Sequence, residues 1–391
     1  MNRQKGSRQT IRVCQLTNSP TPYRNHQFSR FNALFSTDVE CSQEVWFTEW
    51  GDSHGRWRFE SEDLPYPHRF CVPRKLKPGI LSAILAALVV LTRLIIERPD
   101  VIIVGGYTNL ALQATCVFAR VLPMRFVLHV ENHKPFNAAS RVLDLLRTFL
   151  LRSFKVFIVP GALQALYVKQ MCPHHVLIHR MPNVVDESEF AISVCKRRER
   201  KSELRREFGF TESEKLFLSV MRVDAVKGAD VLAEAALTLP QNCRIIIAGT
   251  GPMKETIDCI SRRSGGRLLM LGHMNKDRVL DLLAIADWFV LCSRNDPYPL
   301  SVIEATWAGL PLLLSDAVGC APEALSEGVN GYMFQSGDIH SLSDVLGRAA
   351  NVSSADLVLL GKQSSQIAKA QFSTEIQALR LKHFISVLSA Q

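Results

Sequence analysis

The chain has 391 residues, of which 47% are hydrophobic and 21% are charged, an ordinary globular composition. Its length exceeds what one hydrophobic core usually supports, which argues against a single domain and predicts two of roughly 150–200 residues. Residues 1–190 carry a net charge of +8 and residues 191–391 a net charge of +1. A basic N-terminal half favours a polyanionic partner, namely acidic lipid, a phosphorylated acceptor or nucleic acid, with an ordinary basic surface as the alternative.

The ten cysteines are scattered, and none has C-x-x-C spacing, so a zinc site is not expected. Several, such as Cys292 in "VLCS", lie in apolar runs where a thiol packs as a small hydrophobe. This usage fits a reducing cytoplasm better than secretion, and the polar start "MNRQKGSRQT" is not followed by a signal-peptide core. The expected location is cytoplasmic, with peripheral association at the inner face of the cytoplasmic membrane left open.

In the first half of the chain, β-rich runs alternate with helical patterns. The β-rich runs are expected at 11–18, 43–50, 100–106, 125–132 and 155–161, and the helices at 80–96, 109–121, 139–151 and 162–171. Short apolar strands that alternate with helices predict βαβ units and a parallel sheet.

Segment 80–96, "ILSAILAALVVLTRLII", is apolar enough to be weighed as a membrane span. Arg93 interrupts it, and the unbroken part is shorter than the roughly 20 residues that a span requires. It also leads into "ERPDVIIVGG", which has the pattern of a turn followed by a strand. The sequence therefore favours a helix that is buried or lies against a membrane over one that crosses it.

The alternation pauses at "CKRRERKSELRREFG" (195–209), a basic segment without an apolar stripe that predicts a boundary region. Further strands are expected at 215–222, 243–252, 268–274, 288–293 and 310–316, with helices at 228–238, 253–263, 276–286, from about 300, and at 365–388. The predicted fold is α/β, with Rossmann-like domains over 1–185 and 186–364 and a C-terminal helical segment, 365–391, that returns to the first domain. Two facing, doubly wound domains would enclose a ligand cleft at the carboxyl ends of their strands.

Two cations follow the strand expected at 215–222, in "SVMRVDAVKGADVLAEA". Arg222 stands at the strand end, and Lys227 opens the next helix, whose N-terminus would favour an anion such as a diphosphate. The alternative is a pair of surface cations beside a helix. The glycine turn "IAGTGP" (247–252) has two interpretations, a tight turn or a close approach to a ligand. A lone Gly-x-Gly is weak evidence and does not choose between them.

The stretch "SRNDPYPLSVIEATWAGLPLLLSD" (293–316) has a carboxylate on each side of a loop–helix junction. Two prolines fix the backbone of the loop around Asp296, and Glu304 stands one turn into the helix that begins near Leu300. Carboxylates beside free helix amides suit a ligand with both sugar hydroxyls and phosphate. The alternative is that Asp296 caps the turn and Glu304 complements the helix dipole.

The C-terminal half resembles the donor-binding domain of family 4 glycosyltransferases of the GT-B fold. The resemblance is carried, in order, by "VMRVDAVKGADVLAEA", "IAGTGP", "LGHMNKDRVLDLLAIADWFVLCSRNDPYPLSVIEATWAGLPLLLSD" and "APEALSEGVNGYMF". The family signature is a glutamate, seven residues and a second glutamate, and Asp296 and Glu304 have this spacing. "MPNVVDESEF" (181–190) resembles the family's domain junction, and "SPTPYRNHQFSRF" (19–31) more loosely resembles its loop after the first strand.

The resemblance implies that Arg222 and Lys227 bind the donor diphosphate. It implies further that Asp296 contacts sugar hydroxyls near the reacting carbon and that Glu304 contacts the nucleotide ribose. The other implied donor-binding positions are Gly272, His273, Pro297, Tyr298, Leu300 and Ser301.

Three features depart from the family pattern. Asp296 is one methylene shorter than the usual glutamate, which bears on sugar choice. Met221 replaces the usual glycine before Arg222. Pro20 and Pro22 stand where many relatives have glycines, so the phosphate contact of this first loop is not carried over.

A second polar group follows a strand of the first domain, in "LHVENHKPFN". His129, Glu131 and His133 alternate, so they share one face if the strand continues. The resemblance implies a catalytic histidine that touches the sugar, and His133 is preferred over a core or capping histidine. Tyr23 and Arg24, with Glu131, are expected on the acceptor side, with packing and surface roles as the alternative.

The resemblance implies a retaining transfer of sugar from a nucleoside-diphosphate sugar to a glycan or lipid-linked acceptor, in polysaccharide, lipopolysaccharide or glycolipid biosynthesis. Cations and helix amides can stabilise the leaving diphosphate, and no Asp-x-Asp pair is present, so no metal or other cofactor is expected. A nucleotide-sugar epimerase and a catalytically silent binding protein remain as alternatives. No nucleic-acid motif accompanies the charge, so a peripheral contact with anionic membrane is favoured over nucleic acid.

Overall fold

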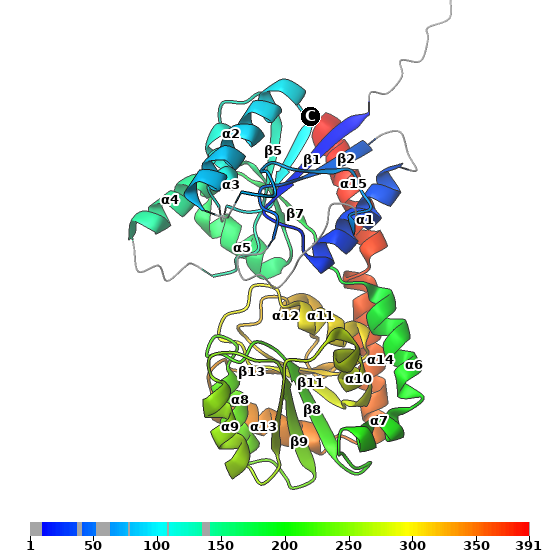
Figure 1. Ribbon diagram of the computed structural model, residues 1–391. Helices are drawn as coiled ribbons and strands as arrows, with labels where there is room; N and C mark the ends of the chain where they lie inside the picture. The colour runs from blue at the N-terminus through cyan, green and yellow to red at the C-terminus, as the bar shows by residue number, and fades with distance from the viewer. Residues whose placement is uncertain are drawn as a thin grey trace, which may run out of the picture. The chain divides into compact units, whose positions relative to one another are not determined.

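The computed structural model of the protein describes residues 10–36, 41–51, 63–76, 79–107, 109–134 and 141–390. Contacts divide the chain into two compact units, each built on one parallel β-sheet (Figure 1). Unit 1 comprises Met1–Pro182 together with Thr374–Gln391, and unit 2 comprises Asn183–Ser373.

Within the described residues, the sheet of unit 1 has seven parallel strands in the order β3-β2-β1-β4-β5-β6-β7. The strands are β1 (Ile11–Thr17), β2 (Cys41–Phe47), β3 (His68–Phe70), β4 (Val101–Val104), β5 (Arg125–His129), β6 (Val156–Val159) and β7 (Leu177–Arg180). The helices are α1 (Pro22–Ser36), α2 (Ile80–Glu97), α3 (Leu110–Phe118), α4 (Arg141–Leu151), α5 (Ala162–Met171) and α15 (Thr374–Ala390).

Strand β4, with the sequence VIIV, shows why the central strands are apolar along their whole length. Val101 and Ile103 belong to a core that includes residues of α1 and α15. Ile102 and Val104 belong to a second core, on the other face of the sheet, that includes residues of α2 and α3. Successive strand residues point to opposite faces, so a sheet covered on both sides needs apolar residues at every position.

The sheet of unit 2 has six parallel strands in the described residues, in the order β10-β9-β8-β11-β12-β13. The strands are β8 (Lys215–Val220), β9 (Cys243–Ala248), β10 (Leu268–Gly272), β11 (Trp288–Leu291), β12 (Leu312–Ser315) and β13 (Gly331–Phe334). The helices are η2 (a π-helix, Ser188–Ser193), α6 (Val194–Arg198), α7 (Lys201–Glu207), α8 (Ala229–Ala236), α9 (Lys254–Arg263), α10 (Lys276–Ile285), α11 (Leu300–Trp307), α12 (Ala321–Ala324), α13 (Ile339–Ala350) and α14 (Ser354–Gln371).

Both sheets reverse their strand order beside their first strand. In unit 1, β1 pairs with β2 on one side and with β4 on the other. In unit 2, β8 pairs with β9 on one side and with β11 on the other. The loops at such a reversal diverge to opposite faces of the sheet and leave a crevice at the carboxyl ends of the strands, where α/β proteins bind ligands. The predicted fold class of two doubly wound α/β domains is confirmed.

Two predictions are wrong, one near each end of the chain. Residues 19–31 were expected as a loop, but Pro22 begins α1, a position where its fixed φ suits a helix and its missing N–H costs nothing. The single helix expected over 365–388 is divided between two helices, α14 and α15. Phe372, which lies between them, is fully buried in the core of unit 2. The second of them, α15, packs instead in unit 1.

The basic segment 195–209 is part of unit 2 rather than a boundary. Arg205 of α7 is buried and donates hydrogen bonds to the carboxylate of Asp287, at 2.8 Å, and to the carbonyl oxygen of Glu214, at 3.0 Å. Leu204 beside it enters the core of the unit. Helix α7 lacks an apolar stripe because one of its buried residues is Arg205, whose guanidinium donates hydrogen bonds to backbone carbonyl oxygens of the following loop.

By length and composition, α2 is long and apolar enough to cross a membrane, with a mean hydropathy of 2.3 over 18 residues. Only 22% of this window is buried within unit 1, although the core helix of a soluble protein is mostly buried. Arg98 ends the helix in the left-handed conformation, with φ 46°, and β4 begins three residues later. The turn and strand expected after this helix are therefore confirmed.

Gly228 lets the loop after β8 lie against the end of β11. Its φ is +68°, and a Cβ atom there would meet the carbonyl oxygen of Cys292 at 2.1 Å. Gly228→Ala should lower the free energy of unfolding by about 1–2 kcal/mol for the left-handed backbone and by a further 1–3 kcal/mol, roughly, for the clash. Urea denaturation should show that Gly265→Ala, at φ +62° with open space around the Cβ, loses only the first contribution. Equal losses would mean that the close approach has no energetic role.

Candidate functional site

The carboxyl ends of β8 and β11 lie side by side in unit 2, because these strands are neighbours. The loop after β8 carries Lys227, and the loop after β11 carries Asp296. The ammonium group of Lys227 donates a hydrogen bond to the carboxylate of Asp296. Two residues that are 69 positions apart thus form one charged pair at the point where the strand order reverses.

Asp296 is held by its backbone as well as by this pair. It is 5% exposed, its N–H donates to the carbonyl oxygen of Ala317 at 3.3 Å, and its own carbonyl accepts from the N–H of Gly319 at 2.8 Å. Burial raises the pKa of Asp296, and the Lys227 ammonium only partly offsets this rise. A buried carboxylate with a single adjacent cation is a fixed hydrogen-bond acceptor with little competition from water.

Asp224 connects the two cations of the loop after β8. Its Oδ1 accepts the backbone N–H of Lys227 at 2.9 Å, and its Oδ2 lies 3.3 Å from Nε of Arg222. The Arg222 side chain is 61% exposed, so its guanidinium is accessible to a ligand. The structure therefore places Arg222 and Lys227 on one braced loop. Sequence reasoning missed Asp224, although an aspartate three residues before a helix-opening lysine is a typical turn former.

Glu304 of α11 lies in a second charged group of unit 2. Burial, with a smaller effect from Glu189 of η2, raises the pKa of Glu304 to about 7, against the opposing charge of Lys276. Lys276, the first residue of α10, donates a hydrogen bond to the carboxylate of Glu189. Near neutral pH, Glu304 can therefore take up or release a proton, and its ionised form accepts hydrogen bonds from hydroxyl groups. Sequence reasoning missed Glu189 and Lys276.

The other predicted donor positions lie at the N-terminal end of α11 and at the end of β10. Pro299, with φ −67°, precedes α11, so the backbone N–H groups of its first turn point away from the helix body. Tyr298 is buried, and Pro297, Leu300 and Ser301 are half-buried. Gly272 ends β10 with φ +73°, and His273 beyond it is exposed.

The glycine turn at 247–252 is a close-packed backbone contact. A Cβ atom on Gly249 would lie 1.8 Å from the carbonyl oxygen of Met221, and one on Gly251 would lie 2.3 Å from that of Val223. The N–H of Gly249 also donates to the carbonyl oxygen of Gly272 at 2.7 Å. These contacts favour the tight-turn interpretation and connect the loop after β8 to the end of β10.

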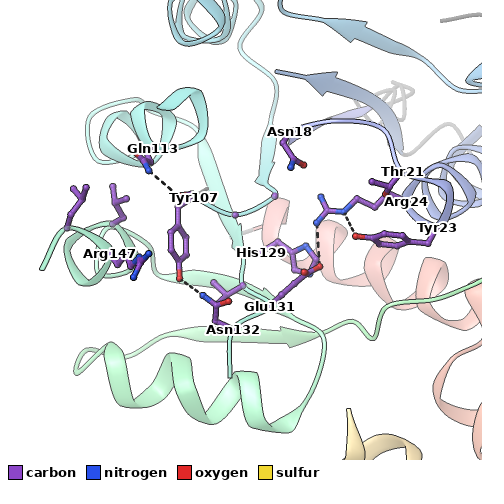
Figure 2. A pocket seen from close by; sticks show the side chains of 15 residues that line it. Asn18, Thr21, Tyr23, Arg24, Tyr107, Gln113, His129, Glu131, Asn132 and Arg147 are labelled. Atoms are coloured by element: carbon purple, nitrogen blue, oxygen red, sulfur yellow. Dashed lines mark hydrogen bonds and ion pairs between the residues drawn. The ribbon is translucent and has the colours of Figure 1, made fainter. Parts of the chain in front are cut away.

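Unit 1 has a pocket of about 470 Å³ at the carboxyl ends of β1, β4 and β5 (Figure 2). The three residues expected on the acceptor side, Tyr23, Arg24 and Glu131, all line it. Nε of Arg24 donates to the Tyr23 hydroxyl at 3.3 Å, and its Nη2 lies 3.4 Å from Oε1 of Glu131. Burial lowers the pKa of Arg24, but Tyr23 and Glu131 outweigh it and leave the pKa raised. The guanidinium is therefore a permanent charge in the pocket wall.

The histidine that lines this pocket is His129 rather than His133. Strand β5 ends at His129, so the condition under which His129, Glu131 and His133 would share one strand face is not met. Burial lowers the pKa of His129 to about 4, so its imidazole is neutral at physiological pH. Its Nε2 is buried and has no hydrogen-bond partner among the described residues. The catalytic role of His133 stays a prediction.

Sequence reasoning missed several further polar residues of the pocket. The hydroxyl of Tyr107, which follows β4, accepts a hydrogen bond from Nδ2 of Asn132 at 3.1 Å, and Gln113 of α3 donates to the Tyr107 carbonyl at 3.3 Å (Figure 2). Tyr107 and Asn132 could have been found by the same signal as Glu131, because each is a polar residue at the end of a predicted strand. Arg147 of α4 lines the same pocket, but a mid-helix position gave no such signal.

Residues 200–384 match the family model of glycosyl transferases group 1. The matched region contains the Lys227–Asp296 pair and Glu304; it begins between α6 and α7 of unit 2 and ends in α15.

Two curated relatives are similar to this chain over part of its length. N-acetyl-alpha-D-glucosaminyl L-malate synthase of Bacillus anthracis is 30% identical over 147 residues, 37% of this chain and 38% of its own length. D-inositol 3-phosphate glycosyltransferase of Xylanimonas cellulosilytica is 29% identical over 176 residues, 44% of this chain and 42% of its own length. The chain thus matches these relatives over less than half of their length.

A similar fold occurs in the Anabaena protein HepE, whose crystal structure contains UDP-glucose. The TM-score is 0.73 at 18% sequence identity, over 96% of this chain and all of HepE. The likeness shows that the two proteins share a fold, as the resemblance to glycosyltransferases of the GT-B fold predicted.

Lys227→Met should weaken the binding of nucleoside diphosphates at least tenfold, roughly, because it removes a charged hydrogen-bond donor and leaves Asp296 buried without its cation. Titration calorimetry with UDP and GDP measures this loss. Lys254→Met removes the same charge from α9, where Nζ pairs with exposed Asp258 at 3.1 Å, and should leave the affinity unchanged. Equal affinities for both variants would exclude Lys227 from the binding site.

Because the pKa of Glu304 is about 7, the affinity for a nucleotide sugar should rise about tenfold between pH 6 and pH 8, as the carboxylate that accepts ribose hydroxyls forms. Glu304→Gln should flatten this calorimetric profile, whereas Glu255→Gln on the exposed face of α9 should not.

The pKa of Glu304 in the folded protein lies above its ordinary value of 4.5, so burial of this side chain favours its protonated form. The contribution of protonated Glu304 to stability is therefore fully present below pH 4.5, and it is lost as the pH rises through 7. Glu304→Gln should therefore raise Tm at pH 8 and not at pH 4; a pH-independent effect would contradict the assignment.

Proposed function

We propose that the protein is a retaining glycosyltransferase of family 4, which transfers a sugar from a nucleoside-diphosphate sugar bound to unit 2 to an acceptor bound to unit 1. The observation that carries the proposal is the pair of half-buried Lys227 and buried Asp296 at the strand-order reversal in unit 2, within the region that matches the group 1 family model. It combines a cation for a diphosphate with a fixed carboxylate for sugar hydroxyls. HepE, which shares the fold, is known with UDP-glucose bound, and this supports a nucleotide sugar as the donor.

Each donor residue has a role in this proposal. Lys227 and the accessible Arg222 bind the diphosphate oxygens, whose negative charge grows as the glycosidic bond lengthens. Asp296 accepts hydrogen bonds from sugar hydroxyls next to the reacting carbon, and Glu304 accepts them from the ribose. Amides at the start of α11, around Leu300 and Ser301, add partial positive charge near the phosphates.

The transfer breaks the bond between the anomeric carbon and the diphosphate oxygen, and the bonding electron pair leaves with the diphosphate. The acceptor hydroxyl oxygen forms the new bond to the same face of the anomeric carbon, and its proton passes to the leaving phosphate. This front-face route requires no protein nucleophile. The cations of Lys227 and Arg222 take the role that a divalent metal has in other phosphate-leaving reactions, so we propose that the reaction needs no metal.

The acceptor in this proposal is a glycan or lipid-linked sugar held in the pocket of unit 1. Arg24, Glu131 and Asn132 offer fixed donors and acceptors for hydroxyl or phosphate groups of the acceptor. Neutral His129 can accept or donate a single hydrogen bond through its buried Nε2. A polar pocket with a permanent guanidinium is suited to a hydroxyl-rich acceptor that carries an anionic group.

A panel of nucleotides and nucleotide sugars tests the proposal through thermal shift, since a ligand that binds the folded state raises Tm. UDP, GDP or one of their sugars should raise Tm in the presence of EDTA, while NAD should not. Arg222→Ala should abolish the shift with little change in the Tm of the free protein, because the Arg222 side chain is exposed. Lys227→Ala should also abolish the shift, and it should lower the Tm of the free protein because Asp296 stays buried without its cation. Wild-type protein that responds to no nucleotide would overturn the proposal.

NMR of the turnover products separates transfer from the other activities of this fold. Retention of the anomeric configuration in a new glycoside supports the retaining route, and inversion excludes it. Conversion of the donor to an epimer without any acceptor would replace the transferase by an epimerase. Activity that disappears in EDTA and returns with Mg²⁺ would overturn metal independence.

A further inference from the structure

Helix α2 is apolar on both of its faces. Its inner face packs on the sheet and on α3 through buried residues: Ala86, Ala87, Val90 and Leu94. Its outer face carries exposed residues with helical i, i+3 and i+7 spacing: Leu81, Ile84, Leu88 and Ile95. A helix on the surface of a water-exposed domain would have polar residues at these outer positions, but Leu81 is 77% and Leu88 59% exposed.

The apolar surface continues from α2 across α3 to α4, which follow one another along one side of unit 1 (Figure 1). We call the exposed apolar side chains of these helices the outer patch: Ile80, Leu81, Ile84, Leu88, Ile95, Ile96, Leu110, Val117, Phe118, Leu145, Leu146 and Phe149. The guanidinium of Arg120, just after α3, lies 4.1 Å from the ring centre of Phe149 on α4 and joins the two helices. The patch therefore spans three neighbouring helices.

The segment of the chain that carries the outer patch is strongly basic. Residues 80–180 contain 11 Lys and Arg against 4 Asp and Glu, a net charge of +7 out of the +9 of the whole chain. An exposed arginine stands just beyond the end of each helix, and its Nε donates to a neutral oxygen: Arg98 to Ile95 O, Arg120 to Ser153 Oγ and Arg152 to Met171 O. Apolar side chains with flanking arginines are the pattern of a surface that sits in the interface of an anionic bilayer.

The topology excludes a transmembrane orientation for α2. Strands β3 and β4 on either side of α2 belong to the same parallel sheet, and α2 is the crossover that connects them across it. Its inner residues pack in the unit 1 cores, so the helix cannot leave the sheet to enter a bilayer lengthwise. A second copy of the chain is also disfavoured as the cover, because two outer patches would bring two surfaces of strong positive charge together.

The pocket of unit 1 opens at the edge of the outer patch. Leu146 and Leu150 of α4 line the pocket, and Leu146 is also an exposed member of the patch. Arg147 lies between them in the sequence and lines the pocket as well. A bilayer against the patch would therefore bring its anionic headgroups next to the polar pocket.

We propose that the outer patch docks unit 1 on an anionic lipid bilayer, with the outer faces of α2, α3 and α4 in the headgroup region. The charge at the helix ends attracts the anionic surface, and the apolar side chains supply the interfacial burial. The inference does not depend on the transferase activity of unit 2.

Vesicle co-sedimentation of the full chain tests the proposal, with phosphatidylcholine vesicles that contain roughly one quarter phosphatidylglycerol. Wild-type protein should bind these vesicles, and the binding should weaken as salt is raised. Leu81→Glu with Leu88→Glu should reduce the partition coefficient at least tenfold, roughly, because charge replaces two apolar side chains at the interface. Arg98→Gln with Arg152→Gln should reduce it by about tenfold on these vesicles through lost electrostatic attraction.

The matched control is Val358→Glu with Leu359→Glu on α14 of unit 2, where both side chains are 58% exposed. This pair adds the same charge and removes similar apolar area, and it should bind vesicles as wild type does. The proposal would be overturned if the control lost as much vesicle binding as Leu81→Glu with Leu88→Glu, or if the latter pair lost none. It would also be overturned if wild-type protein bound pure phosphatidylcholine vesicles equally well. So would a wild-type dimer without vesicles that Leu81→Glu with Leu88→Glu converts to monomer, since a second copy would then cover the patch.

The Tm shift with nucleotide, measured on the same variants, shows that they are folded and separates the two proposals. Vesicle binding without any nucleotide response would overturn the proposed transferase and leave the membrane surface standing. A nucleotide response without vesicle binding would overturn the proposed membrane surface and leave the proposed transferase standing.

Discussion

A parallel sheet must be covered on both faces, because each crossover connection lays a helix against it. The central strands are therefore fully buried and apolar, as VIIV of β4 and WFVL of β11 are, and chemistry is confined to the loops at their carboxyl ends. Lys227 and Asp296 in unit 2, and Arg24 and Glu131 in unit 1, all occupy such loops or the residues that follow them. The position of both candidate sites follows from this constraint on the sheet.

The same burial sets the charge of each group at these sites. Asp296 keeps a cation in direct contact, whereas Glu304 has only a more distant lysine against the effects of burial and Glu189, and its pKa rises to about 7. His129 is neutral because burial outweighs the neighbouring Glu131. One protein thus contains a paired carboxylate, a carboxyl that titrates near neutrality and an imidazole without charge, each produced by a different balance of desolvation and neighbouring charge.

Helix α2 obeys the covering rule on its inner face and departs from the usual amphipathic pattern on its outer face. A water-exposed face would favour polar residues, but this face carries leucine and isoleucine over four turns, and residues 80–180 hold +7 of the +9 net charge of the chain. An anionic bilayer accounts for both observations at once. It would also place lipid headgroups at the mouth of the pocket that holds Arg24 and Arg147.

The sequence by itself determined the alternation of strands and helices, the two doubly wound sheets, and the loops that carry Arg222, Lys227, Asp296 and Glu304, because apolar period and strand-end polarity are local signals. Only the tertiary structure decided which charges meet. Glu189 and Lys276 have no local signature of their role, His129 rather than His133 lines the pocket because β5 ends there, and the break at Phe372 depends on a core far away in sequence. Such pairings depend on strand order and packing between distant segments, which no sequence window contains.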